Sequence, residues 1–192
     1  MKTIQDDTIY EMEVKNSKFI TLLFSVHNES EIKSILEKVR LRYPKATHYC
    51  YCYRLIDKQK ANDDGEPSGT AGVPMLHILE QEDFVFALAV VVRYFGGIKL
   101  GSGGLIRAYS KAVREAVYCA KTVELVEGYR VRLCFSYDNQ RQIDYLVRDF
   151  LVVDKSFKEN ITYILLIPKD SISILDSYHY DIIKEEYIEK TR

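Results

Sequence analysis

A short segment rich in carboxylates offers the first candidate chemistry, and it consists of Asp63, Asp64, Gly65 and Glu66. Three carboxylates within four residues could hold Mg²⁺ or act as general acid and base. Nucleophilic catalysis would use a nearby hydroxyl, and Ser68 and Thr70 are the candidates. The structural alternative is a turn with solvated charges, so the residues alone leave both interpretations open.

A glycine-rich stretch offers a second kind of chemistry, because five of the nine glycines fall between residues 96 and 104. The candidate anion-binding residues there are Gly96, Gly97, Lys99, Gly101, Ser102, Gly103 and Gly104. Backbone amides converge on an anion where such a loop leads into a helix, and Ser102 is predicted to cap that helix. The spacing does not match a P-loop, which needs Lys at position 102. It does not match a dinucleotide fingerprint either, because Ile106 stands where a small residue is required.

A basic stripe is predicted on the helix that follows the glycines. Its buried face is predicted from residues at helical spacing, namely Leu105, Ile106, Tyr109, Ala112, Val113, Ala116, Val117 and Ala120. The opposite face carries Arg107, Lys111 and Arg114, with Lys121 further along. The stripe could contact phosphates, and the alternative is an ordinary solvated helix face.

The segment 47–54 alternates between two sets of side chains with a period of two, which predicts a strand. One face carries His48, Cys50 and Cys52, and the other carries Tyr49, Tyr51 and Tyr53. We expect no metal on the first face, because one strand offers a row of ligands and not a tetrahedron. The tyrosine row could stack unpaired bases, or it could simply pack in the core.

Hydrophobic periodicity predicts a mixed sequence of strands and helices. The first part is predicted to hold strands over 8–15, 18–26, 47–54 and 84–92, with helices over 29–42 and 73–80. Residues 16 and 17 are predicted to form the first turn, and residues 57–72 an exposed loop. After a boundary segment at 121–128, strands are predicted over 129–137, 151–157, 162–167 and 181–188, with helices over 138–150 and 171–178. That order, βαββαβ, is the order of a ferredoxin-like unit.

Composition limits the classes of function. The 192 residues include 27 Lys and Arg against 28 Asp and Glu, a net charge of −1. The first part (1–122) counts 17 against 15, or +2, and the second (123–192) counts 10 against 13, or −3. A protein that binds nucleic acid through bulk charge is usually strongly basic, so any such contact must be confined to a patch. The start of the chain lacks an apolar leader and the four cysteines suit reduced thiols, so we expect a cytoplasmic protein without a membrane partner.

Two segments resemble the signature of the IMPACT family, bacterial YigZ type. They are DDGEPSGTAGVPML (63–76) and VVVRYFGGIKLGSGGLIRAY (90–109), and the likeness extends from 16–20 through 48–50 to most of the chain. The resemblance implies an α+β protein with a domain at 1–122 and a ferredoxin-like domain at 123–192. It further implies that the first domain contains a left-handed βαβ element like that of elongation factor G domain IV, and that the second resembles domain V. It also implies that the carboxylate-rich loop that contains residues 63–66 and the glycine-rich loop that begins at residue 96 form one surface.

The resemblance points to a binding protein connected with translation, whose partner is RNA, the ribosome or a translation-related protein. No cofactor is expected, and the sequence does not define the oligomeric state. Eukaryotic family members regulate translation with an additional N-terminal domain that this chain does not show, so that mechanism is not transferred. The alternative is an enzyme that acts on a phosphorylated or anionic small molecule between the two loops.

Overall fold

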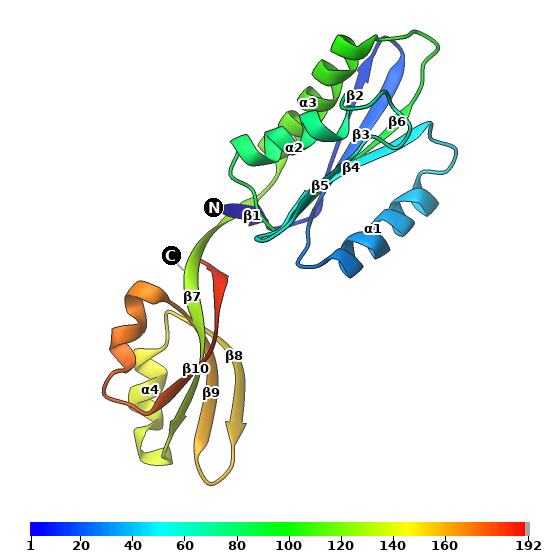
Figure 1. The fold of residues 1–192 in the computed structure, drawn as a ribbon. Coiled ribbons are helices and arrows are strands. Elements are labelled where there is room, and N and C mark those ends of the chain that lie inside the picture. The colour runs from blue at the N-terminus through cyan, green and yellow to red at the C-terminus, as the bar shows by residue number, and fades with distance from the viewer. Residues whose placement is uncertain (191–192) are drawn as a thin grey trace. The chain divides into compact units, whose positions relative to one another are not determined.

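The structure, a computed structural model, describes residues 1–190 and has the α+β architecture that the sequence predicts (Figure 1). The chain divides into two compact units, unit 1 from Met1 to Val123 and unit 2 from Glu124 onward. Unit 1 contains β1 (Lys2–Ile4), β2 (Thr8–Val14), β3 (Ser17–Ser25), α1 (Glu29–Arg42), β4 (His48–Arg54), β5 (Gln59–Asn62), α2 (Gly72–Gln81), β6 (Ala87–Tyr94) and α3 (Ser102–Cys119). Within residues 1–190 no helix is long and apolar enough to cross a membrane.

The main sheet of unit 1 has the strand order β2-β3-β6-β4-β5, with every neighbouring pair antiparallel. Helices α2 and α3 cover one face and α1 covers the other, as Figure 1 shows. The apolar run that predicts a central strand supplies β6, which is paired on both sides and buried on both faces. Its side chains alternate between the two cores, with Ala89 and Val91 facing α2 and α3, and Val90 and Val92 facing α1.

Two crossover connections of opposite hand build this sheet. Strands β3 and β4 run parallel on either side of β6 and are joined by α1, whereas β5 and β6 run parallel on either side of β4 and are joined by α2. The two connections start from strands that run in opposite directions, move across the sheet in opposite directions and carry their helices on opposite faces. Each of these three differences reverses the hand of a crossover, so the two connections have opposite hands. One of them is therefore left-handed, although crossovers are usually right-handed. The left-handed element that the resemblance implies is present, and the likeness to elongation factor G stays an expectation.

Unit 2 has the predicted βαββαβ order. It contains β7 (Thr122–Phe135, which begins two residues before the boundary), η1 (Tyr137–Asn139), α4 (Gln140–Leu146), β8 (Leu151–Phe157), β9 (Ile161–Pro168), η2 (Lys169–Leu175) and β10 (Tyr180–Glu189). Strands β8, β9, β7 and β10 lie side by side in that order, all antiparallel. Ile143 of α4 and Leu175 of η2 pack against the same face of the sheet. The arrangement is that of a ferredoxin-like unit.

Several predicted elements need correction. The predicted helix over 171–178 is the 3-10 segment η2, whose serines and β-branched isoleucines disfavour an α-helix. The helix predicted over 138–150 is shortened to η1 and α4. The boundary predicted at 121–128 is mostly strand, because β7 runs without interruption from Thr122. The first hairpin turns at Lys15 and Asn16, one residue earlier than predicted, and both residues have positive φ.

The predicted exposed loop at 57–72 also differs. Residues 59–62 form strand β5, a four-residue edge strand paired with β4. The segment gives no periodic signal because two of its residues, Gln59 and Lys60, are exposed and only Ala61 packs against the core. Glu66, Thr70 and Ala71 are buried, so the rest of the segment is not a solvated loop.

Candidate functional site

The two signature segments meet at one end of the unit 1 sheet. The strand register places the end of β6, the start of β4 and the start of β3 next to one another, because Arg93 pairs with His48 and Tyr94 with Lys18. We call this end of the sheet the loop end. Four connecting segments therefore lie there: the turn at 15–16 and the segments 43–47, 63–71 and 95–101. We call 63–71 the acidic loop and 95–101 the glycine loop.

Asp63 is held inside the acidic loop by backbone amides. Its Oδ1 accepts from the N–H of Ala71 and Gly72 at 3.0 and 2.8 Å, and its Oδ2 accepts from Gly69 at 2.8 Å. These amides lie at and just before the start of α2, where N–H groups have no helical acceptor and the helix dipole favours a negative charge. Asp63 therefore stabilises the start of a helix, and its oxygens are occupied.

Asp64 connects the acidic loop to α1 and β4. Its Oδ1 accepts from Arg40 at 2.7 Å and its Oδ2 from the N–H of Tyr49 at 2.7 Å. Its backbone carbonyl lies 2.9 Å from Nδ1 of His48. The second carboxylate of the segment is therefore also used to position neighbouring elements.

Glu66 is the centre of a buried polar cluster. Its side chain is 3% exposed and forms a salt bridge with Arg93, whose side chain is 5% exposed. The hydroxyl of Tyr109 donates to the same carboxylate oxygen at 2.7 Å, and Nε2 of His48 lies 3.8 Å from the other oxygen. Burial strongly raises the pKa of Tyr109, so this hydroxyl remains a donor. Two buried charges and their hydrogen bonds thus join the acidic loop to β6 and α3.

Arg93 extends the cluster to the glycine loop. Its Nη2 donates to Oγ of Ser17 at 3.3 Å, and the same oxygen accepts from the N–H of Gly96 at 3.2 Å. The chain Glu66–Arg93–Ser17–Gly96 therefore connects the acidic loop to the glycine loop through buried groups. In this geometry the two signature segments adjoin a common buried polar cluster. That they form one surface stays a prediction.

The row of His48, Cys50 and Cys52 does not assemble a metal site. Cys50 Sγ lies 3.0 Å from the carbonyl of Asp63 and 3.3 Å from the hydroxyl of Tyr109. Burial raises the pKa of Cys50 to about 12 and raises that of Cys52 further, so both thiols are protonated at neutral pH. Among residues 1–190 no group of three or more His, Cys, Asp or Glu side chains is placed to hold a metal ion.

The tyrosine row is not available for stacking. Tyr49 and Tyr53 are buried, and Tyr51 packs against the core beneath α1. The hydroxyl of Tyr53 donates to Glu29 of that helix. The hypothesis that these rings stack bases is therefore wrong, because the helix predicted between β3 and β4 covers this face of the sheet.

The glycines of the signature have different structural roles. A Cβ on Gly96 would lie 2.0 Å from the backbone of Asn16, so only glycine fits there. Gly97 and Gly101 have φ of 87° and 72°, a region that glycine adopts readily. Gly101 takes the N-cap position of α3, so Ser102 is not the cap and the N-cap residue has no side chain that could bond the first amides. A Cβ on Gly103 would meet only the Nη1 of Arg107, at 3.6 Å, so packing does not explain that glycine.

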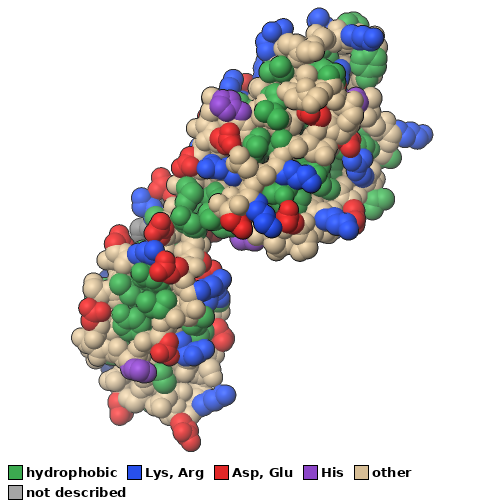
Figure 2. All heavy atoms as spheres, in the orientation of Figure 1, with side chains coloured by type: hydrophobic (Ala, Val, Ile, Leu, Met, Phe, Trp, Pro, Cys, Tyr) green, Lys and Arg blue, Asp and Glu red, His purple; other side chains and the backbone are tan. Residues whose placement is uncertain are grey.

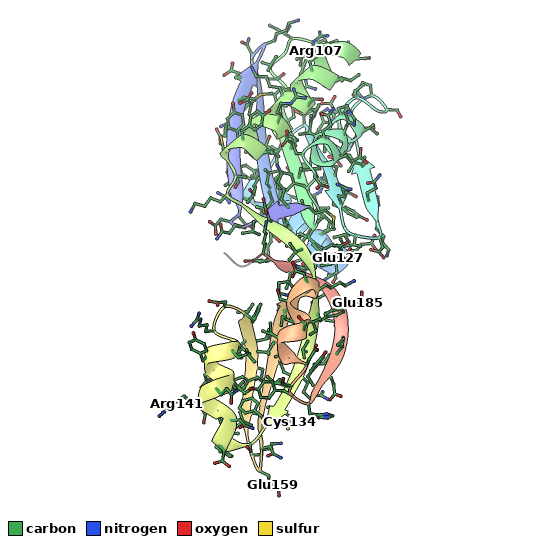
Figure 3. The ribbon with its side chains drawn as sticks, turned by 90° about the vertical axis from the view of Figure 1, so that its left-hand side faces the viewer. Arg107, Glu127, Cys134, Arg141, Glu159 and Glu185 are labelled. Carbon is green, nitrogen blue, oxygen red and sulfur yellow. The ribbon has the colours of Figure 1, made fainter. Side chains whose placement is uncertain are left out.

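Exposed cations gather at the loop end and continue along α3. Five cations at the loop end are exposed and form no salt bridge within residues 1–190: Lys15, Arg42, Lys45, Lys99 and Arg107. The carboxylates of the acidic loop, in contrast, are bonded to Arg40, Arg93 or backbone amides. Figure 3 shows Arg107 on α3 in this part of the unit. Lys111 and Arg114 are exposed on the same helix, as predicted, whereas Lys121 lies beyond its end and pairs with Asp6.

Three exposed apolar residues belong to the same loop and helix turn as Lys99 and Arg107, and sequence reasoning missed them. We call them the apolar patch: Phe95, Ile98 and Ile106, which are 44%, 47% and 41% exposed. Figure 2 shows hydrophobic side chains beside Lys and Arg at this end of unit 1. Ile106 was predicted to be buried, but it lies at the rim of the helical face. Phe95 and Ile98 directly border Gly96 and Gly97, and an apolar residue inside a glycine-rich loop was the available signal.

The fold and this surface define the class: an α+β protein of two compact units whose first unit carries an exposed basic and apolar surface over a buried polar cluster. Residues 15–117, more than half of the chain, match the Impact N-terminal domain. The chain belongs to the IMPACT family.

Relatives cover both units. The chain is 39% identical over 166 residues to the IMPACT family member YvyE of Bacillus subtilis (strain 168), which covers 84% of this chain and 76% of that protein. It is 44% identical over 110 residues to the IMPACT family member YigZ of Escherichia coli (strain K12), which covers 55% and 54% of the two chains. A crystal structure described as that of a hypothetical protein aligns with a TM-score of 0.65 at 29% identity and covers 95% of this chain and 97% of that one.

Proposed function

We propose that this protein binds RNA, free or within the ribosome, and acts in translation without catalysing a reaction. The binding surface is the loop end of unit 1 together with the exposed face of α3. The observation that carries the proposal is the segregation of charge there. Within residues 1–190, exposed cations without a salt bridge gather at an end where the three carboxylates of the acidic loop are bonded within the protein.

This segregation explains how a chain with a net charge of −1 can attract a polyanion. Affinity for nucleic acid comes mainly from cations that displace counterions at phosphates, and only the cations near the strand contribute. The uncapped first turn of α3 adds backbone N–H groups at the positive end of its dipole. The proposal includes a cytoplasmic location and leaves unit 2 free to contact a translation-related protein.

The enzyme alternative has less support in the geometry. A general acid or base must reach the proton that it transfers. The carboxylate oxygens of Asp63 and Asp64 accept hydrogen bonds from backbone amides and Arg40. The carboxylate of Glu66 is buried against Arg93 and Tyr109. Ser68, one of the two candidate nucleophiles, is exposed, with no hydrogen bond to an orienting side chain within residues 1–190. Thr70, the other, is buried and donates its hydroxyl to the carbonyl of Pro67 at 2.7 Å.

Charge reversal tests the proposal. The double variant Arg107→Glu and Lys111→Glu should weaken RNA binding across unrelated sequences by tenfold or more, because two phosphate contacts are lost. The slope of log K against log salt should shrink by about 1 for each lost contact. Binding is measured by fluorescence anisotropy over a range of salt concentrations, and thermal stability should be unchanged because both side chains are exposed.

The matched control is Arg141→Glu with Arg148→Glu, which makes the same change in net charge on exposed residues of unit 2. It should leave RNA affinity nearly as in the wild type. The proposal is wrong if wild-type protein shows no salt-dependent association with RNA or ribosomes near physiological ionic strength. It is also wrong if both double variants reduce affinity equally, because the effect would then come from net charge alone.

A further inference from the structure

The apolar patch at the loop end differs in chemistry from a surface that contacts only phosphates. Phe95, Ile98 and Ile106 are each at least 41% exposed, whereas the apolar face of α3 and the tyrosines of β4 are covered. Lys99 and Arg107 lie in the same loop and helix turn as the patch. A ligand that fits this surface must combine negative charge with flat apolar groups.

Phe95 is held in place from both its backbone and its ring. Its N–H donates to Oγ1 of Thr47 at 3.0 Å, and the guanidinium carbon of Arg93 lies 5.5 Å from the ring centroid. Arg93 is itself fixed by Glu66 and Ser17. The ring is therefore pre-positioned while 44% of the residue stays exposed, so little conformational entropy is lost when a ligand covers it.

The backbone beside the ring is open. Apart from the residues next to them in the chain, a Cβ placed on Gly97 or on Gly101 would meet no atom within 4 Å, so within residues 1–190 no side chain from elsewhere lies against these two glycines. Gly103 in the first turn of α3 is also not packed against the core. A planar group can therefore approach Phe95 while its attached phosphate reaches the cations.

We infer that the ligand of this surface is single-stranded RNA, with an unpaired base stacked on Phe95 and flanking phosphates at Lys99 and Arg107. This inference rests on the proposed function and names its substrate class. A duplex buries the faces of its bases and presents mainly phosphates and sugars. Contact with the apolar patch would therefore add no stacking to the binding of a duplex. A single strand presents both phosphates and π-faces, and stacking on aromatic side chains is how such strands are bound with little sequence preference.

The test compares two RNA probes with the full-length protein, an oligouridylate and a duplex with the same number of phosphates, at one ionic strength. Wild-type protein should bind the oligouridylate about tenfold more tightly. Phe95→Ala should reduce that affinity about tenfold and leave the duplex affinity and the salt slope unchanged. Phe95→Leu, which retains apolar volume, covers the case in which Phe95→Ala does not fold, and it should also lose the preference for the single strand. Phe95→Tyr should keep it.

The matched control is Phe157→Ala, which removes a ring of unit 2 that is 54% exposed, and it should not change either affinity. The inference is overturned if wild-type protein binds both probes equally, or if folded Phe95→Ala or Phe95→Leu keeps the wild-type preference. It is also overturned if loss of the ring prevents sedimentation with ribosomes but leaves oligouridylate affinity intact, because the patch would then contact protein. Binding to duplex that depends on Arg107 would preserve the proposed function in each case. Absence of binding to both probes and to ribosomes would reject the proposed function as well.

Discussion

Asp63 shows how a residue that suggests chemistry in the sequence can serve structure. Its carboxylate accepts three backbone N–H groups, those of Gly69, Ala71 and Gly72. The N-cap residue of α2, Ala71, contributes no side-chain hydrogen bond. The charge therefore stabilises the fold of the acidic loop, and its removal leaves several amides without an acceptor.

We predict that Asp63→Ala destabilises the protein by about 2 kcal/mol or more, because hydrogen bonds to a charged group contribute more than neutral ones and their buried partners lose solvation. The measurement is the midpoint of urea denaturation. Ser68→Ala, a change at an exposed residue of the same loop, is the control and should shift the midpoint little. If Asp63→Ala were as stable as Ser68→Ala but had lost turnover of an anionic small molecule, the enzyme alternative would regain support.

Residue types in the two signature segments were predictable as a candidate site, but their environments were not. A sequence does not indicate whether Glu66 is solvated or buried, because Arg93 and Tyr109, its partners, come from 27 and 43 positions away. The same limit applies to Phe95, which is 44% exposed although the next residue, Gly96, packs against the first hairpin. Charge on α3 was predictable because helical spacing alone places Arg107, Lys111 and Arg114 on one side.

At the scale of elements, the Glu66–Arg93 pair connects the acidic loop to the glycine loop, which are not joined to each other by strand hydrogen bonds. Glu66 belongs to the acidic loop, Arg93 to β6, and Ser17, at the start of β3, links Arg93 to Gly96. When one partner of a buried ion pair is removed, the other is left as an uncompensated buried charge, and the free energy of unfolding falls strongly. A change in the acidic loop should therefore alter the glycine loop as well.

We predict that Glu66→Gln destabilises unit 1 by about 3 kcal/mol and raises amide hydrogen exchange in both the acidic loop and the glycine loop. The control is Ile32→Ala, which opens a cavity under α1 on the other face of the sheet at a cost of about 2–5 kcal/mol. It should raise exchange in α1 more than in either loop. Equal exchange in the glycine loop for wild type and Glu66→Gln would show that the two loops are not coupled.

The elements that sequence predicts well are those with a strong local pattern. The bounds of α1 follow from periodicity, and β6 follows from its apolar run. The misassigned elements, β5 and η2, are short and gain their structure from a neighbour. Strand β5 exists because β4 offers a free edge, and η2 is a 3-10 turn whose buried side chain is Leu175.

At the scale of the whole molecule, the two parts of the chain were predictable from their patterns, but the nature of the junction was not. The compact units divide between Val123 and Glu124, inside β7, so a strand and not a flexible loop connects them. Each unit has its own apolar core, with Leu88 in the first and Leu133 in the second. That the units are separate folding domains remains a prediction.

We predict that the units unfold independently. Leu88→Ala and Leu133→Ala each remove a fully buried leucine side chain and should each cost about 2–5 kcal/mol. If each unit is a domain with its own cooperative transition, Leu133→Ala should raise hydrogen exchange throughout unit 2 and leave the core strands of unit 1 protected as in the wild type. Leu88→Ala should give the reverse pattern, and the double variant should show the sum of the two effects because the sites share no core. Exchange is followed by mass spectrometry on full-length protein. A single cooperative transition, in which Leu133→Ala lowers protection in β6 as much as in β9, would contradict independent folding and would make β7 a structural continuation of both units.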